Sequence, residues 1–500
     1  MLALFALARA AYLLWGPFDL SPDEAHYWEW SRRLGMSYYS KGPAVAWVIA
    51  FFAWIFGPTA FGVRAGAVVF STLASYLLYL LARDIFGDER DAFYAALLAN
   101  IVPIFAAGAV LMTTDVLFVF FWTAAALCVN SAIKDGETGA WRWYLAGAAI
   151  GLGFLSKYTM VLIYPCLLLF FFFAKKERFW LRRREPYLCG LISLAIATPV
   201  IYWNISHGQV TIKHTMGQAH VGAGAGFSIA HLIEFAASQA ALITPLVFAA
   251  CVYGLWRSVS TGMREGRSGP LLAFFTSAPL FAFFLMASLH GKVQANWAVA
   301  SYVTAFAAAP WAFRALCDKS GPKLKGLLKY GAIIAIAICA VASVIVYEPA
   351  IIEAAGARRV ISRPPFNRVT GWRELGDRIS GIEAQMPKDT GVFIISDTYQ
   401  ITSELAFYVK GNPVAYNAFT GGRRMNQYDL WPGYDKLAGY NAIYVKGGSA
   451  EAEPAITGRF DRCGREIFTV YRNGAVLKEF SIFRCYNFMG GAEDKEIGKY

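Results

Sequence analysis

The chain has 500 residues, of which 57% are hydrophobic and only 16% are charged, and its formal net charge is +12. Soluble domains carry roughly 25% charged residues, so this composition excludes an ordinary soluble protein and indicates a polytopic membrane protein. The basic excess would by itself also fit a nucleic-acid-binding protein. However, much of it falls in loops between apolar segments, which argues against a nucleic-acid partner.

Apolar segments follow one another through the first 347 residues. The segment at 44–56 begins just after Pro43 and is shorter than the roughly 20 residues that a spanning helix needs, so we expect it to lie in the membrane interface. The others predict about eleven transmembrane helices. They occur at 2–16, 61–82, 92–110, 116–133, 144–155, 159–174, 187–205, 231–256, 271–289, 295–313 and 326–347.

The loops between these segments differ in charge. Those at 175–185, 257–267 and 314–329 are rich in Lys and Arg, whereas those at 109–115 and 289–296 have at most one such residue each. By the positive-inside rule, the basic loops are cytoplasmic. The first loop, 18–60, and the C-terminus are then predicted on the periplasmic side of a bacterial inner membrane.

From residue 348 the composition changes to that of a soluble domain. Helical periodicity at 371–386 and 400–410 alternates with short apolar runs that predict strands, and 465–488 predicts a hairpin turning at Asn473-Gly474. We therefore predict a membrane-embedded domain over 1–347 and a periplasmic α/β domain over 348–500. Cys463 and Cys485 flank the hairpin, either as a disulfide or as two free thiols.

The first loop contains the stretch SPDEAHYWEWSRRLGMSYYSKGP, residues 21–43. Its adjacent carboxylates, Asp23 and Glu24, are candidates for a general base, because ionisable groups beside a bilayer are often functional. The alternative is that they cap and charge the first turn of a helix, and one residue could do both. His26, Tyr27 and Tyr39 are candidate substrate contacts in the same loop.

Further polar residues lie at predicted outer helix ends. Asp115 follows MTT at the break between two apolar runs, and either it or one of the threonines before it could cap the second run. Lysines can neutralise a phosphate, although a lysine here could also snorkel to the interface. The candidates are Lys41, Lys157 and Lys292, with Gln294 and Asn296 beside the last. Together they suit transfer of a group from a phosphate leaving group to a hydroxyl.

Evidence for a cofactor is weaker. His207, His214 and His220 share one hydrophilic loop and could bind a divalent metal, but solvated loop histidines are the simpler interpretation. The glycine-rich 221–227 follows no strand and so predicts no dinucleotide site. Asn204-Ile205-Ser206 matches a glycosylation sequon, a tripeptide that is frequent by chance.

Several of these stretches resemble a known family. SPDEAHYWEWSRRLG, YYSKGP and MTTDVLFVFFW are similar to loop motifs of the bacterial GT-C glycosyltransferases, in the protein O-mannosyltransferase and aminoarabinose (lipid A) transferase group, which is glycosyltransferase family 39-like. GLGFLSKYT and KVQANW add to a resemblance that covers roughly residues 18–300. One departure is Ser40-Lys41-Gly42-Pro43, where the aminoarabinose branch has Glu-Lys-Pro-Pro.

The resemblance implies inverting transfer of a sugar from a polyprenyl-phosphate donor. It implies Asp23 as the base or acceptor-orienting acid with Glu24 beside it, Lys41 on the donor phosphate, and Asp115 as a second acidic residue. The expected partners are the lipid-linked sugar, membrane lipid, and a glycolipid, glycan or protein acceptor. A flippase or transporter is the main alternative, but the chain has no evident internal repeat, and its acids lie at predicted outer helix ends.

Overall fold

The computed structural model describes residues 1–218, 226–348, 350–354, 366–387, 389–420 and 423–491. The chain forms two compact units. One, here called the helical unit, comprises 1–14, 41–45 and 64–347. The other, here called the sheet unit, comprises 15–40, 46–63 and 348–500. The first loop therefore belongs mainly to the same compact unit as the C-terminal part of the chain.

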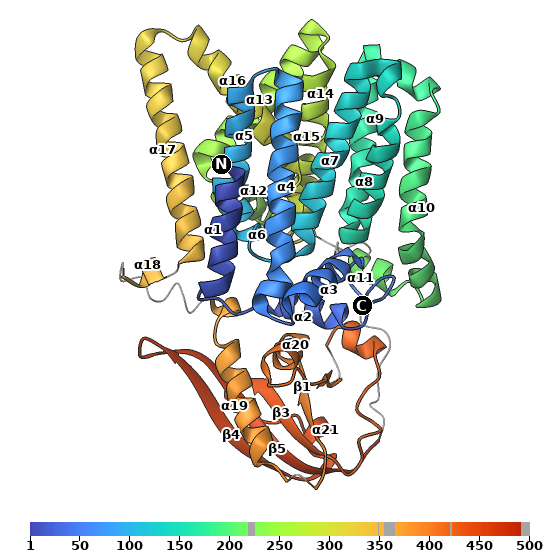
Figure 1. Ribbon diagram of the computed structural model, residues 1–500, viewed down its shortest axis with the longest axis vertical. Coiled ribbons are helices and arrows are strands. Elements are labelled where there is room, and N and C mark those ends of the chain that lie inside the picture. Colours follow the sequence, from blue (N-terminus) through green and yellow to red (C-terminus); the bar gives the residue numbers. More distant parts are fainter. Residues whose placement is uncertain (219–225, 349, 355–365, 388, 421–422, 492–500) are drawn as a thin grey trace. The chain divides into compact units, whose positions relative to one another are not determined.

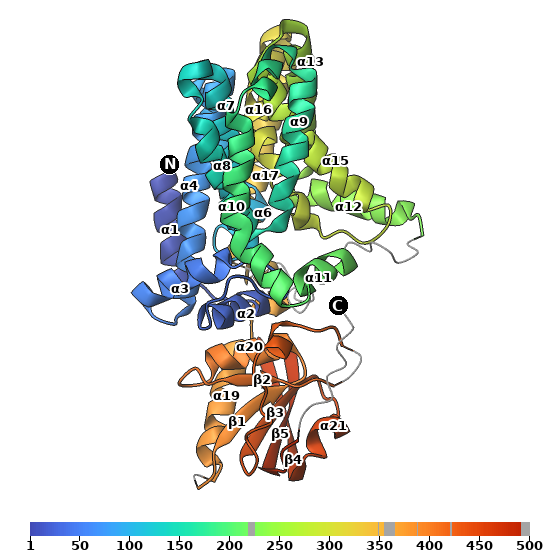
Figure 2. The same cartoon turned by 90° about the vertical axis from the view of Figure 1, so that its right-hand side faces the viewer.

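The helical unit is built from helices, the longest of which run side by side (Figures 1 and 2). Its helices are α1 (Leu2–Trp15), α4 (Ala60–Phe86), α5 (Glu89–Ile101), α6 (Pro103–Gly108), α7 (Thr114–Asp135), α8 (Arg142–Ser156), α9 (Ile163–Phe173), α10 (Glu185–Ser206), α11 (Val210–Gln218), α12 (Ile229–Ile243), α13 (Pro245–Glu265), α14 (Ser268–Phe275), α15 (Ala278–Ala287), α16 (Ser301–Lys319) and α17 (Pro322–Tyr347).

Among the described residues, five helices are long and apolar enough to cross a membrane: Ala60–Phe86, Thr114–Gly139, Glu185–Ser206, Ser268–Ala287 and Pro322–Tyr347. A sixth candidate is the pair α12–α13, which is bent by 103°. The apolar stretch predicted at 231–256 is thus two helices instead of one. Thr244 between them has a φ of 69°, and Pro245, which lacks an N–H donor, starts the second helix.

Small residues allow close packing between these helices. A Cβ on Gly147 of α8 would lie 2.5 Å from the carbonyl oxygen of Cys189 in α10, and one on Gly151 would lie 2.7 Å from Cβ of Ile196. Both substitutions would collide with the facing helix. Glycines at this spacing let the two backbones approach closely, as is common between apolar helices.

The sheet unit contains a mixed five-stranded sheet with the order β2-β1-β3-β5-β4. Its strands are β1 (Val392–Ser396), β2 (Ala415–Asn417), β3 (Asn441–Gly447), β4 (Phe460–Arg472) and β5 (Ala475–Phe488). β1 is parallel to β2 and β3, whereas β5 is antiparallel to β3 and β4. The predicted strands and hairpin are confirmed, and Asn473 and Gly474 take the positive φ values that such a tight turn requires.

Two helices confirm the predicted periodicity of this unit. α19 (Trp372–Gln385) buries one face, including Leu375, Ile379 and Ile382. α20 (Tyr399–Tyr408) is buried almost all round, because it packs on the sheet and also on α2 (Pro22–Ser31) of the first loop. The short apolar α3 (Ala44–Phe56) exposes Phe51 and Trp54. Cys463 and Cys485 face each other across β4 and β5 and form a disulfide.

Candidate active site

Asp115 is the centre of a polar cluster in the helical unit. Thr113 caps α7, since its hydroxyl oxygen accepts a hydrogen bond from the backbone N–H of Asp115, and the Asp115 carboxylate remains available for other partners. Lys157 Nζ lies 2.5 Å from Oδ1, and Asn296 Nδ2 donates to Oδ2 at 2.5 Å. Three residues that the sequence placed at separate helix ends are thus brought together.

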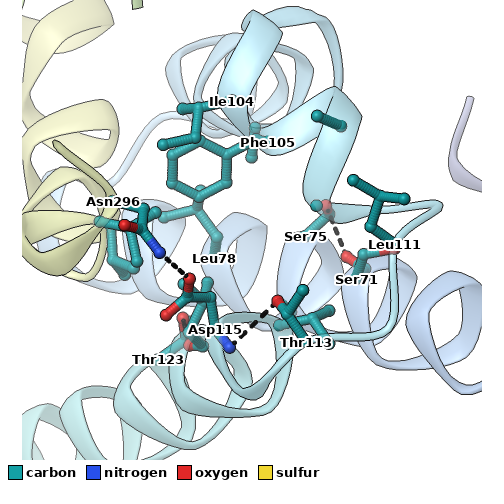
Figure 3. A pocket seen from close by; sticks show the side chains of 18 residues that line it. Ser71, Ser75, Leu78, Ile104, Phe105, Leu111, Thr113, Asp115, Thr123 and Asn296 are labelled. Carbon is teal, nitrogen blue, oxygen red and sulfur yellow. Dashed lines mark hydrogen bonds between the residues drawn. The ribbon is translucent and has the colours of Figure 1, made fainter. Parts of the chain in front are cut away.

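The cluster borders a cavity of about 200 Å³ (Figure 3). Asp115, Asn296 and a few hydroxyls are the polar groups in its wall, and Leu78, Ile104 and Phe105 are among the apolar ones. The lining residues come from α4, α5, α6, α7 and α16 and from the short segments next to them. An apolar cavity with a few polar groups in its wall suits a ligand with one polar end and one hydrocarbon end.

Lys41 begins the short segment 41–45 that belongs to the helical unit. A Cβ on Gly42 would lie 2.0 Å from the carbonyl oxygen of Leu155, near the end of α8. Only glycine fits so close an approach. The chain at Lys41 therefore passes directly beside the turn that carries Lys157, the residue that ends α8 and binds Asp115.

Lys292 and Gln294 are arranged differently. Lys292 Nζ lies 2.6 Å from Glu234 Oε1 of α12, and its side chain is 70% exposed. Gln294 is exposed at the start of η4 (Ala295–Ala298). Asn296 is the residue of this loop whose side chain contacts Asp115.

In the sheet unit, the adjacent carboxylates of the first loop have different surroundings. Glu24 is fully buried and completes a capping box with Ser21, the N-cap of α2. Its Oε2 accepts from the Ser21 backbone N–H at 2.9 Å. Asp23 keeps a side chain that is 44% exposed. Of the pair, Glu24 stabilises the helix start and Asp23 is partly exposed to solvent.

The three candidate substrate contacts are buried. His26 lies among the rings of Trp30, Tyr399 and Tyr428, and this burial lowers its pKa to about 3. Tyr27 packs against Trp30. The backbone N–H of Tyr39 donates to Gln427 Oε1 at 2.7 Å. In this structure His26 and Tyr39 connect the first loop to the C-terminal part of the chain.

Sequence reasoning did not single out the segment RRMNQYDLW, residues 423–431, that supplies Gln427. Arg423 forms a two-point ion pair with Asp429, at 2.8 and 2.7 Å. Asp429 also completes a capping box with Asn426 at the start of η7 (Gln427–Leu430). The Asn-x-x-Asp spacing could have indicated this cap. The contact between Gln427 and Tyr39, which are 388 residues apart in the sequence, had no local signal.

No group of three or more His, Cys, Asp or Glu side chains that could hold a metal is found in the described part of the chain. The histidine cluster considered above includes His220, which lies outside the described residues. Asn204 of the sequon is buried, and its side chain donates to Val200 O and accepts from the Thr211 N–H. This arrangement makes Asn204 inaccessible as a glycosylation site.

Sequence comparison finds related proteins with known names. Residues 40–203 match the dolichyl-phosphate-mannose-protein mannosyltransferase family. A lipid A galacturonosyltransferase of Rhizobium johnstonii is 28% identical over 61% of this chain and 63% of its own length. An undecaprenyl phosphate-α-4-amino-4-deoxy-L-arabinose arabinosyl transferase of Pseudomonas paraeruginosa is 31% identical over 35% of this chain and 34% of its own. The matches thus span less than two thirds of these relatives.

The fold has close counterparts among solved structures. ArnT from Cupriavidus metallidurans bound to undecaprenyl phosphate superposes with a TM-score of 0.67, covering 98% of both chains at 15% identity. The oligosaccharyltransferase AglB from Archaeoglobus fulgidus gives 0.55, at 13% identity, over 89% of this chain and 68% of its own. The family match, the named relatives and the shared fold make this chain similar to the GT-C glycosyltransferases of the family 39-like group.

Proposed function

We propose that the protein transfers a sugar, with inversion, from an undecaprenyl-phosphate donor to a hydroxyl of lipid A. The observation that supports this most directly is the Asp115–Lys157–Asn296 cluster beside an apolar cavity, because a polyprenyl-phosphate sugar pairs a polar end with a hydrocarbon tail, and Lys157 is the cation of the cluster. The names of two relatives supply the lipid A acceptor and the undecaprenyl-phosphate donor. A surface glycan or a protein is the alternative acceptor.

The donor side of the reaction is assigned to the helical unit. Lys41 binds the donor phosphate, and Lys157 assists it. An ammonium group has three N–H donors, so Lys157 retains hydrogen-bonding capacity while it binds Asp115. Asp115 orients Lys157, since both of its carboxylate oxygens are occupied. Of the three candidate lysines, Lys292 has the least support as a phosphate ligand, because its exposed side chain is paired with Glu234.

The acceptor side is assigned to Asp23. In the proposed step, Asp23 takes the proton of the acceptor hydroxyl, whose oxygen forms a bond to the anomeric carbon of the sugar. The bond between that carbon and the phosphate oxygen breaks, and undecaprenyl phosphate leaves with the electron pair. General-base help of this kind contributes about 10²–10⁴-fold, and positive charge near the phosphate stabilises the leaving group.

We further propose a location for the reaction. The basic loops predict an inner-membrane protein of about eleven spans, with the first loop and residues 348–500 in the periplasm. The helices that are long enough to span support several of these crossings.

Reconstitution tests the proposal. The purified protein is placed in lipid vesicles with undecaprenyl-phosphate galacturonic acid or undecaprenyl-phosphate 4-amino-4-deoxy-L-arabinose, together with lipid A. Mass spectrometry then follows the lipid A. A mass increase by one sugar residue, with release of undecaprenyl phosphate, is expected for one of the donors. Movement of an intact donor across the bilayer without such release would instead identify a flippase.

A further inference from the structure

Two residues of the C-terminal part of the chain hold Asp23. The hydroxyl of Tyr399, the first residue of α20, donates to Oδ1 at 3.2 Å. The guanidinium of Arg368, in η6 (Phe366–Val369), has Nη2 3.6 Å from Oδ2. Each carboxylate oxygen therefore has its own partner. Because the Asp23 side chain is still 44% exposed, part of the carboxylate remains open to a substrate hydroxyl.

The Tyr399 ring and the backbone at Arg368 are themselves held by further contacts. The Tyr399 ring packs 4.9 Å from the ring of His26, on the same helix as Asp23. The carbonyl oxygen of Arg368 accepts a hydrogen bond from Trp372 Nε1 at 2.8 Å. The next carbonyl, that of Val369, accepts from the backbone N–H of Asp19 at 2.9 Å. Rigid support of this kind is what a precisely oriented catalytic group requires.

The protonation state of Tyr399 suits a hydrogen-bond donor. Burial, with the negative charge of Asp23 beside it, raises the pKa of the Tyr399 hydroxyl above its usual value. The hydroxyl thus keeps its proton at neutral pH and directs it at the carboxylate. Hydrogen bonds to charged groups contribute more to stability than those between neutral groups.

Anchoring of the loop does not depend on this hydrogen bond. The Leu20 N–H donates to the Tyr408 hydroxyl at 2.7 Å, the Tyr39 N–H binds Gln427, and Arg32 Nη2 donates to the carbonyl oxygen of Asn412 at 2.9 Å. Trp28 packs on Phe407 as well. Loss of one hydroxyl at Tyr399 would therefore leave the loop in place.

We infer that Tyr399 and Arg368 are positioning residues that fix the orientation of the Asp23 carboxylate toward the acceptor hydroxyl. This inference rests on the proposed function. The C-terminal part of the chain would then take part in the reaction, because it supplies the two residues that contact the general base.

Three variants and two controls test the inference in the vesicle assay. Tyr399→Phe removes the hydroxyl and keeps the ring, Arg368→Gln removes the charge, and Arg368→Lys retains it. Tyr440→Phe, at an exposed tyrosine, and Arg373→Gln, at an exposed arginine that faces Asp19, are matched controls in the same unit. For each protein, kcat, the KM for the donor and the unfolding midpoint are measured.

Tyr399→Phe and Arg368→Gln are expected to lower kcat roughly 10-fold with the donor KM and the unfolding midpoint little changed, because the lost contacts orient a reacting group and do not bind the donor. Arg368→Lys is expected to recover part of the loss, and both controls to match the wild type. If the wild type transfers sugar but Tyr399→Phe and Arg368→Gln both keep the wild-type kcat, the inference is wrong while the proposed function stands. A kcat loss that follows a lowered unfolding midpoint would also overturn it. Absence of transfer by the wild type would reject the proposed function and this inference with it.

Discussion

Both carboxylate oxygens of Asp115 are occupied, one by a buried ammonium and one by an amide. The side chains of Lys157 and Asp115 are only 9% and 20% exposed. In such surroundings each charge depends on the other, because a lone buried charge is costly. Asp23 contrasts with this pair, since it is partly exposed and has a less enclosed carboxylate. This contrast agrees with the different roles proposed for the two acids, orientation for Asp115 and proton transfer for Asp23.

We predict that Lys157→Met lowers the free energy of unfolding by roughly 3 kcal/mol, because it leaves the Asp115 carboxylate without its cation. The double variant Asp115→Asn/Lys157→Met should recover much of this loss. Thermal unfolding in detergent measures both. Lys292→Met is the control, since its exposed ion pair with Glu234 should contribute about 1 kcal/mol or less. Equal effects of Lys157→Met and Lys292→Met would contradict the prediction.

Asp23→Asn is expected to lower sugar transfer by about 10²–10⁴-fold while expression and the unfolding midpoint stay close to those of the wild type, because an amide cannot take up the proton of the acceptor hydroxyl. Glu24→Gln should behave in the opposite way and mainly destabilise the start of α2, where the Glu24 carboxylate closes the capping box. Transfer assays and thermal unfolding on the two variants separate the roles. Near-normal turnover by Asp23→Asn would remove Asp23 from the base role.

At the scale of elements, two junctions determine where the site residues lie. The segment that starts at Lys41 packs against the end of α8, where Gly42 closely approaches the backbone of Leu155. In the sheet unit, α2 packs on α20, which brings His26 against Tyr399 and Tyr428. Each junction is a tight packing contact, so small changes in volume or charge there should affect the site.

We predict that Gly42→Ala lowers transfer by about 10²-fold, because its Cβ would collide with the backbone of Leu155 and shift Lys41 away from its place beside α8. Gly190→Ala in α10 is the control, since a Cβ there meets nothing within 4 Å and alanine favours a helix. Initial rates in vesicles measure the effect. Full activity in Gly42→Ala would show that the site tolerates displacement of Lys41.

The pH dependence of stability tests the junction of α2 and α20. His26 has a pKa of about 3 in the folded protein against 6.5 in its ordinary state. Between these values the unfolded chain binds a proton that the folded chain does not, so the free energy of unfolding falls as pH falls, by about 1.4 kcal/mol for each pH unit. Above pH 6.5 the contribution of His26 is constant. Buried acids also titrate in this range, so the comparison is between wild type and His26→Phe. Identical pH profiles for the two would contradict the prediction.

At the scale of the whole molecule, the grouping of the chain differs from its order in sequence. The first loop shares a compact unit with residues near the C-terminus, whereas Lys41 belongs with the helices. A change that destabilises the sheet unit is therefore expected to affect Asp23 as well as the sheet. The disulfide between Cys463 and Cys485 joins the two strands of its terminal hairpin.

Replacing both Cys463 and Cys485 with serine should destabilise the sheet unit by roughly 3 kcal/mol, the usual value for a loop of about this length, because the unfolded chain gains freedom. Unfolding followed by the fluorescence of the protein with and without dithiothreitol measures it. The reductant should lower the stability of the wild type and leave that of the double serine variant unchanged. Sensitivity of both proteins to reductant would point to another cause.

Much of this protein follows from local sequence. Apolar length and charge placement indicate a membrane protein, and alternating periodicity predicts the strands, the helices and the turn at Asn473-Gly474, because these signals depend only on neighbouring residues. The loop motifs also singled out Asp23, Lys41 and Asp115 as candidates. The break at Thr244 was missed, because Pro245 is compatible with either the first turn of a helix or an interruption of one.

Only the tertiary structure decided which partners these candidates have. The pairing of Asp115 with Lys157 and Asn296, the capping of α7 by Thr113, and the contacts of Asp23 with Tyr399 and Arg368 join residues whose separations in sequence range from 2 to 376 positions. The longer contacts arise when packed helices and a folded sheet bring distant segments together, and a single sequence carries no periodic signal for them. The sequence thus determined the kinds of groups available for catalysis, and packing decided which of them orient one another.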